Sequence, residues 1–209
     1  YESPGWFMNH QDYYDRYHRG GTKVYLGEYA AHIPNRANCL ETALAEALYL
    51  CSVERNGDVV EMTSYAPLFA RKGHTNWNPD MIYFDNTTVN LTTGYQVQKL
   101  FGQNSGSKYI KSSIKLETPN SDVYHRIGSS VVVDEETGEK IIKVVNVLPV
   151  ANSFDVQLPT KADVVYSLLL TGNLEDTELV PSSFDSVQVE GSKLSFTLPA
   201  YSFVVIRTK

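Results

Sequence analysis

The sequence runs Thr22-Lys23-Val24-Tyr25-Leu26-Gly27-Glu28-Tyr29-Ala30 at the point that decides the fold. We expect a short strand over Lys23–Gly27, whose apolar run is typical of a parallel sheet buried on both faces. The strand is followed by the carboxylate of Glu28, and core packing does not explain an acid at this position. Functional groups of parallel α/β folds collect at the carboxyl ends of the strands. Glu28 is therefore a candidate functional residue, and the alternative is a structural partner of a cation or a loop amide.

The residues that follow predict a strand–helix–strand unit. Apolar side chains recur at three- to four-residue spacing over Asn38–Arg55 and mark one face of a helix. Asn38 and Glu41 resemble a capping box, and Gly57 suits the carboxyl-terminal cap. A second strand is expected over Asp58–Thr63. The distance between the two strands fits a right-handed crossover that joins a parallel pair.

Two more helices and a long loop complete the first half of the chain. A helix rich in Tyr and His is expected over Phe7–Arg19, and another over Thr93–Phe101. The loop Tyr65–Asn90 contains Trp77 and Asn78, and loops of this length in compact domains are usually functional or disordered. We therefore expect Trp77 and Asn78 near the site at the strand ends.

The second half reads as repeated short strands. The composition changes through residues 102–107, so we divide the chain into domains 1–106 and 107–209. The acidic segment Asp134–Glu139 predicts a hairpin turn. Many strands at this spacing indicate an antiparallel β-sandwich or jelly roll. The expected strands are Tyr109–Lys115, Val123–Val133, Lys140–Val147, Phe154–Leu158, Asp163–Leu170, Val187–Val189, Lys193–Leu198 and Ser202–Arg207.

Composition excludes several classes of protein. The 209 residues are 42% hydrophobic and 20% charged, as in ordinary globular domains. A net charge of −6 argues against nucleic acid as a partner, and no apolar run is long enough to cross a membrane. Cys39 and Cys51 are expected about 18 Å apart on one helix, too far for a disulfide, and are interpreted as core residues. The histidines lack metal-ligand spacing, so no metal site is predicted.

Three segments carry a resemblance to a known family. They are Val24–Ala30, the run Asp58-Val59-Val60-Glu61-Met62-Thr63-Ser64-Tyr65-Ala66-Pro67-Leu68-Phe69, and the run Trp77-Asn78-Pro79-Asp80-Met81-Ile82-Tyr83-Phe84-Asp85. In order and spacing they resemble α-L-arabinofuranosidases of glycoside hydrolase family 51, and the β-rich end resembles that family's terminal sandwich. The resemblance implies an α/β plus all-β fold: the last two β/α units of a (β/α)8 TIM barrel, followed by the sandwich.

The resemblance also implies a reaction. Glu28 aligns with the nucleophile of a retaining glycosidase that releases terminal α-L-arabinofuranosyl residues and requires no cofactor. Tyr29, Tyr65, Trp77 and Asn78 become candidate substrate-binding residues, with core packing as the alternative for the two tyrosines. The implied partner is an arabinofuranosyl-containing oligosaccharide or polysaccharide, such as arabinan or arabinoxylan, and the implied location is secreted or periplasmic.

The family's acid/base glutamate follows an asparagine, and none of the thirteen asparagines in this chain precedes a glutamate. We therefore expect the chain alone to be inactive or nearly so, because leaving-group protonation typically contributes about 10²–10⁴-fold. Unpaired strand edges of a truncated barrel also favour self-association. The competing hypotheses are a non-catalytic carbohydrate-binding module that acts through its β-sandwich, and a structural domain in which Glu28 has no catalytic role.

Overall fold

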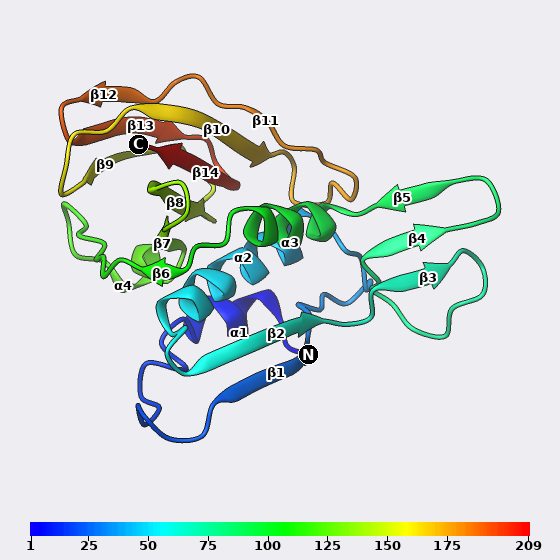
Figure 1. The fold of residues 1–209 in the computed structure, drawn as a ribbon. Helices are drawn as coiled ribbons and strands as arrows, with labels where there is room; N and C mark the ends of the chain where they lie inside the picture. The colour runs from blue at the N-terminus through cyan, green and yellow to red at the C-terminus, as the bar shows by residue number, and fades with distance from the viewer.

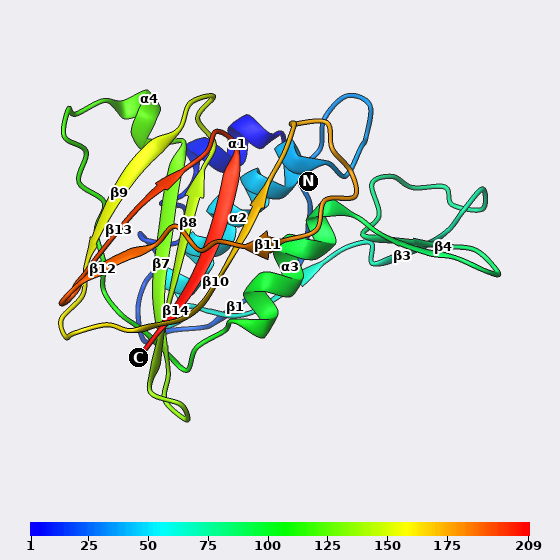
Figure 2. The ribbon, with the colours of Figure 1, turned by 90° about the horizontal axis from the view of Figure 1, so that it is seen from above.

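The computed structural model describes residues 1–209 and contains more strand than helix, as Figures 1 and 2 show. The helices are α1 (Pro4–Asn9), α2 (Leu40–Arg55), α3 (Thr93–Gln103) and α4 (Ser121–Tyr124). The strands form four sheets, and none of these sheets closes into a barrel. None of the helices combines the length and apolar composition that a membrane span requires.

The first sheet contains only β1 (Val24–Tyr29) and β2 (Val60–Tyr65), which run parallel with Val24 opposite Val60 and Tyr29 opposite Tyr65. Helix α2 connects them, so the predicted strand–helix–strand unit is confirmed. The expected burial of both faces is wrong: Tyr25 is 59% exposed and Met62 is 58% exposed. The reason is visible in Figure 1, where the helices cover one face of this sheet and leave the other open.

Helix α2 lies at the centre of the molecule. It is buried along almost its whole length, from Leu40 to Ser52, because α1, α3 and the large sheet of the second half all pack against it. The helix begins after Cys39, whose amide donates to the Thr42 hydroxyl. The predicted capping box of Asn38 and Glu41 is therefore wrong. Cys39 and Cys51 are free and buried, as core residues should be.

The predicted helix over Phe7–Arg19 ends at Asn9 and continues as turns. Arginine side chains contact the carbonyl groups that a continuous helix would use. Arg55 donates to the carbonyl of Gln11, and Arg19 donates to the carbonyls of Tyr14 and Asp15. These side-chain bonds, of which that from Arg55 comes from another part of the chain, replace the helical pattern, so local propensity does not decide this segment.

The long loop expected over Tyr65–Asn90 contains a small sheet instead. β3 (Phe69–Arg71) pairs parallel with β4 (Ile82–Phe84), which pairs antiparallel with β5 (Val89–Leu91). These three strands form an arm that projects from the body of the molecule (Figure 2). We call strands β3–β5 and their connecting turns the arm.

The second half forms two antiparallel sheets face to face. One has the order β11-β10-β14-β8-β7-β6 and the other β12-β13-β9. Their shared core includes Ile142, Leu194, Phe196 and Ile206, so the predicted sandwich arrangement is present. Its strands are β6 (Lys108–Tyr109), β7 (Ile127–Asp134), β8 (Glu139–Asn146), β9 (Asn152–Gln157), β10 (Val164–Thr171), β11 (Ser182–Ser183), β12 (Gln188–Glu190), β13 (Lys193–Leu198) and β14 (Ser202–Thr208).

Two of the expected strands of the second half are wrong in part. Tyr109–Lys115 contributes only the second residue of β6, and Val123–Val133 begins in α4 before β7 starts at Ile127. The predicted hairpin turn joins β7 to β8, and Gly138 there has a φ of 73°, which a glycine adopts without strain.

The two halves share one continuous core. Leu44 and Leu48 of α2 lie in the same buried cluster as Val145 and Phe203 of the large sheet. The ring of Phe101 in α3 stacks on Phe203 with 5.2 Å between centroids. The chain therefore changes secondary structure near residue 106 without interrupting its core.

Candidate active site

Glu28 is the next-to-last residue of β1 and its side chain is exposed. Its Oε2 accepts a hydrogen bond of 2.7 Å from the hydroxyl of Tyr1. Partial burial, together with the Glu28 carboxylate, raises the pKa of Tyr1 to about 12. Tyr1 therefore remains a hydrogen-bond donor at neutral pH and holds the carboxylate in a fixed orientation.

Aromatic rings surround this hydrogen bond. Tyr1 stacks on His32 with 5.1 Å between ring centroids and lies 5.5 Å from the ring of Trp77. The guanidinium of Arg36 lies 5.6 Å from the centre of the Trp77 ring. Burial and the neighbouring Arg36 lower the pKa of His32, which favours its neutral form. We call Tyr1, His32, Arg36 and Trp77 the aromatic cluster.

The structure thus brings two predicted site residues, Glu28 and Trp77, to the same surface through Tyr1. Trp77 is 43% exposed, so its ring is accessible. Asn78 follows it, and its Oδ1 accepts from the hydroxyl of Tyr83, which in turn accepts from the amide of Asp80. Trp77 and Asn78 both belong to the β3–β4 connection of the arm, and Tyr83 of β4 fixes the Asn78 side chain.

Tyr29 and Tyr65 lie beneath this surface. They are 3% and 7% exposed, with 5.8 Å between their ring centroids. The Tyr29 hydroxyl donates to Gln98 of α3 at 2.7 Å, and the Tyr65 hydroxyl accepts from Asn38 at 3.2 Å. Both rings belong to the core of this chain and support the strand ends from below.

The comparisons with known proteins identify the family. Residues 13–202 match the family described as alpha-L-arabinofuranosidase C-terminal domain. The chain belongs to this family. It is 44% identical over 112 residues to an extracellular exo-alpha-L-arabinofuranosidase of Streptomyces chartreusis, covering 54% of this chain and 13% of that protein. It is 28% identical over 214 residues to alpha-L-arabinofuranosidase A of Aspergillus niger, covering 99% of this chain and 32% of that protein.

A solved structure agrees with these relatives. An arabinose-bound α-L-arabinofuranosidase of family GH51 superposes with a TM-score of 0.88 at 28% identity, covering 100% of this chain and 36% of that one. The resemblance to glycoside hydrolase family 51 is confirmed. This member of the C-terminal domain family spans about a third or less of the length of these relatives.

One buried acid of this family member was not singled out from the sequence. Glu46 of α2 is 1% exposed, and its Oε1 accepts from the amide of Ala31 at 2.9 Å, three residues after Glu28. Burial raises the pKa of Glu46 to about 8. The sequence feature that could have identified Glu46 is its position inside the apolar run Ala43–Leu50. Core packing explains an acid there no better than it explains Glu28 at the end of its strand.

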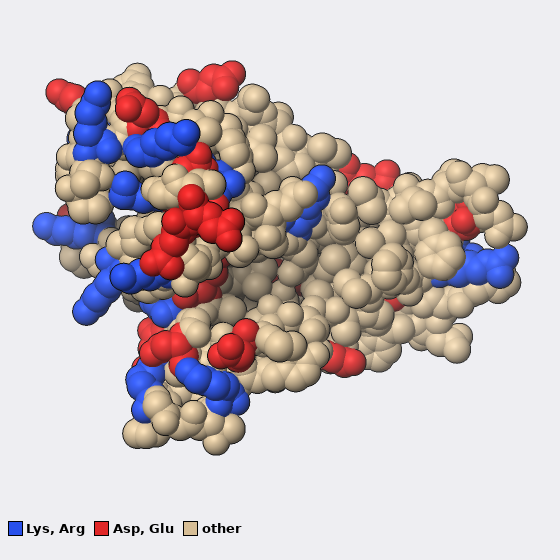
Figure 3. Space-filling view, in the orientation of Figure 1, with Lys and Arg blue, Asp and Glu red and all other residues tan.

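A cleft of about 1130 Å³ lies at the opposite ends of β1 and β2 from Glu28. Charged side chains gather on this side of the molecule (Figure 3). Those that line the cleft include Arg19, bound to Asp58, and Arg55, bound to Asp15. Arg19 and Arg55 are thus already paired within the cleft. Glu28 remains the candidate because it lies near the carboxyl end of a parallel strand, whereas this cleft lies at the amino ends.

Proposed function

We propose that the chain is part of a retaining α-L-arabinofuranosidase, with Glu28 as the nucleophile. The observation that carries this proposal is an exposed carboxylate at the carboxyl end of a parallel strand, fixed by Tyr1 and flanked by the accessible ring of Trp77. Membership in the arabinofuranosidase C-terminal domain family supports the same assignment. An exposed tryptophan suits a sugar because its flat face packs against the apolar face of the ring.

In the proposed reaction, a carboxylate oxygen of Glu28 attacks the anomeric carbon of an arabinofuranosyl residue. The glycosidic C–O bond breaks, and the leaving oxygen takes a proton from a second carboxyl group, which must lie about 5–5.5 Å from the first. Water then cleaves the glycosyl-enzyme. Because the sequence lacks the Asn-Glu dipeptide of the family, we propose that the second carboxyl lies outside this chain and that the chain alone is inactive.

The remaining roles follow from position. Trp77 and Asn78 are proposed to border the bound sugar, and Tyr29 and Tyr65 to act from below by holding the strand ends. We propose that β1 and β2 are the last two strands of a (β/α)8 barrel in domain 1–106, because they pair in parallel across α2. Domain 107–209 is the sandwich. The open edge of β1 favours self-association.

The proposed substrate is an arabinofuranosyl-containing polysaccharide, and nucleic acid and membrane are not proposed as partners. A secreted or periplasmic location is proposed by analogy with the extracellular Streptomyces relative. The alternative, a carbohydrate-binding module without catalysis, predicts polysaccharide binding by the sandwich and no bond cleavage under any condition.

A substrate with a good leaving group tests the nucleophile without the missing acid. Dinitrophenolate departs unprotonated, and azide can replace water as the second nucleophile, so dinitrophenyl α-L-arabinofuranoside with azide should yield arabinosyl azide. An ordinary phenyl arabinofuranoside should yield no arabinose. Glu28→Gln should abolish the azide reaction, whereas Glu61→Gln, an exposed acid on β2, should leave it unchanged. Azide-dependent turnover that persists in Glu28→Gln would contradict the proposal.

A further inference from the structure

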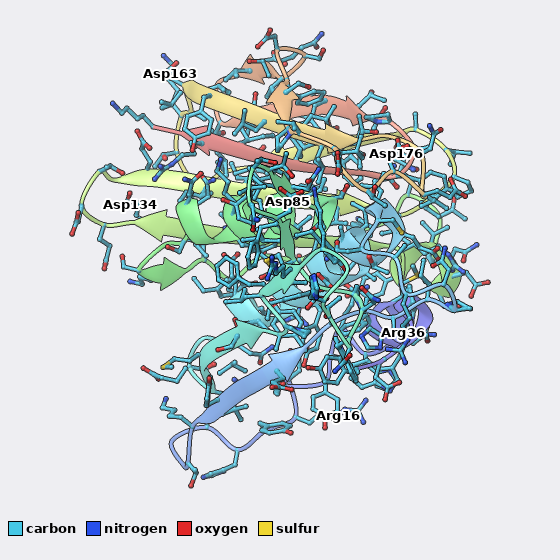
Figure 4. All side chains as sticks on the ribbon, turned by 90° about the vertical axis from the view of Figure 1, so that its right-hand side faces the viewer. Arg16, Arg36, Asp85, Asp134, Asp163 and Asp176 are labelled. Atoms are coloured by element: carbon cyan, nitrogen blue, oxygen red, sulfur yellow. The ribbon has the colours of Figure 1, made fainter.

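A second cavity, of about 330 Å³, lies next to the aromatic cluster. Three separate parts of the chain line it: the β1–α2 loop with Arg36 and Asn38, the arm with Tyr83 and Asn90, and the β10–β11 loop with Thr177 and Glu178. Figure 4 views the molecule from the side of the arm. Arg36 and Asp176, which belongs to the β10–β11 loop, both lie to the right of Asp85 in this view. The cavity lies where these three segments meet.

The base of the cavity is rigid. Asn38 is 5% exposed, and its Oδ1 accepts from the amide of Gly94 at 2.9 Å, while its Nδ2 donates to the carbonyl of Asp80 at 3.2 Å. Arg36 has a φ of 55°, a left-handed conformation that is uncommon outside glycine and is concentrated at functional sites. The walls are therefore formed before any ligand binds.

The cavity shares two residues with the neighbourhood of Glu28. Arg36 lies over the Trp77 ring on one side and lines the cavity on the other. Tyr83 donates its hydroxyl to Asn78 and also lines the cavity. A polymer held at the aromatic cluster could therefore extend into the cavity without crossing the core.

The lining alternates donors and acceptors. Asn90 Nδ2 donates to Glu178 Oε1 at 2.8 Å, which fixes that carboxylate and leaves its Oε2 to accept from a ligand. Arg36 offers donors, Thr177 a hydroxyl and Tyr83 an aromatic ring. The Lys72 ammonium also lines the cavity and is bound to Thr88 and Asp85. Neighbouring hydroxyl groups of a sugar need donors and acceptors side by side. An apolar ligand would leave these polar groups unpaired.

We propose that this cavity is a secondary saccharide-binding site, which holds one neutral pentose unit of the polysaccharide apart from the residue attacked by Glu28. The choice of a pentose rests on the proposed function. The site itself rests on the cavity, its fixed base and the oriented carboxylate of Glu178. Its role would be to position a longer chain relative to the aromatic cluster.

Titration of the whole 209-residue chain with arabinotetraose and xylotetraose, followed by NMR and calorimetry, tests this proposal. The side-chain amides of Asn38 and Asn90 should shift with saturation, and Glu178→Ala should weaken binding about tenfold or more, as expected for loss of a hydrogen bond to a charged group. Glu178 is exposed, so the variant should fold. Glu175→Ala, exposed on the same loop, is the matched control and should bind like the wild type.

Glu28→Gln separates this proposal from the proposed function. If the cavity holds the sugar, Glu178→Ala should weaken tetrasaccharide binding more than Glu28→Gln does, even if the azide reaction shows that Glu28 is not a nucleophile. Binding that is lost in Glu28→Gln and retained in Glu178→Ala would place the sugar at Glu28 and overturn the proposal. Absence of binding at millimolar concentrations of both tetrasaccharides would also overturn it.

Discussion

Replacing Glu46 with glutamine should make the chain more stable at neutral and alkaline pH, because the wild-type carboxylic acid is held in an environment that disfavours its ionisation. Glu46 is 1% exposed, and its Oε2 has no hydrogen-bond partner. Burial raises its pKa to about 8 from the ordinary value of 4.5, and the hydrogen bond from Ala31 offsets only part of this effect. Glutamine keeps the acceptor for Ala31 and cannot ionise.

The sign and the size follow from proton linkage. Below pH 4.5 the folded and unfolded states both hold the proton, so Glu46 contributes no pH dependence. Between pH 4.5 and 8 the unfolded state loses the proton and the folded state keeps it, so the free energy of unfolding falls by about 1.36 kcal/mol per pH unit. Over the range from 4.5 to about 8 the loss is about 5 kcal/mol, and above pH 8 it stops increasing.

Urea unfolding at pH 5, 6, 7 and 8 measures this effect. The difference in unfolding free energy between Glu46→Gln and wild type should widen by about 1.4 kcal/mol with each pH unit. Contributions from other acids cancel in that difference. The nearest titratable neighbours, Tyr29 and Tyr65, stay protonated because burial and the Glu46 charge raise the pKa of each. Glu41→Gln, on the less buried first turn of α2, should show no widening. A pH-independent difference for Glu46→Gln would refute the reasoning.

Two further substitutions test the junction between the halves and the base of the cavity. Lys143 is fully buried, and its Nζ lies 2.7 Å from Oε1 of the partly buried Glu54 and donates to the carbonyl of Asn104. Lys143→Met removes both partners and should cost up to about 3 kcal/mol, and adding Glu54→Gln should restore part of this loss in urea unfolding. In α3, a Cβ at Gly94 would overlap the carboxamide of Asn38 and approach its Nδ2 to 2.8 Å, so Gly94→Ala should lower the thermal midpoint. Gly102→Ala in the same helix, with no atom within 4 Å of the new Cβ, should raise it through a gain of about 0.5–1 kcal/mol.

Helix α2 was predictable from its apolar repeat and the β7–β8 hairpin from its acidic turn between apolar segments, although packing by several elements buries more of α2 than one face. The structure of Phe7–Arg19 was not predictable, because its carbonyl groups accept hydrogen bonds from Arg55 and Arg19. Arg55 lies more than forty residues from Gln11 in the sequence, and no local pattern predicts that contact. The arm was missed for a different reason. Its strands have three residues each, too few to show an alternating pattern.

The candidate site shows the same division. Glu28 could be selected from the sequence because core packing does not explain an acid at the end of an apolar strand. The same argument, however, applies to Glu46 inside an apolar helix. Only the three-dimensional arrangement separates the two acids. Glu28 lies near the end of β1, where Tyr1 fixes it and solvent reaches it. Glu46 lies beneath the strand end, where burial favours its neutral form and Ala31 binds it. Under the proposed function Glu28 attacks a substrate, whereas Glu46 holds the segment that follows Glu28 through the amide of Ala31.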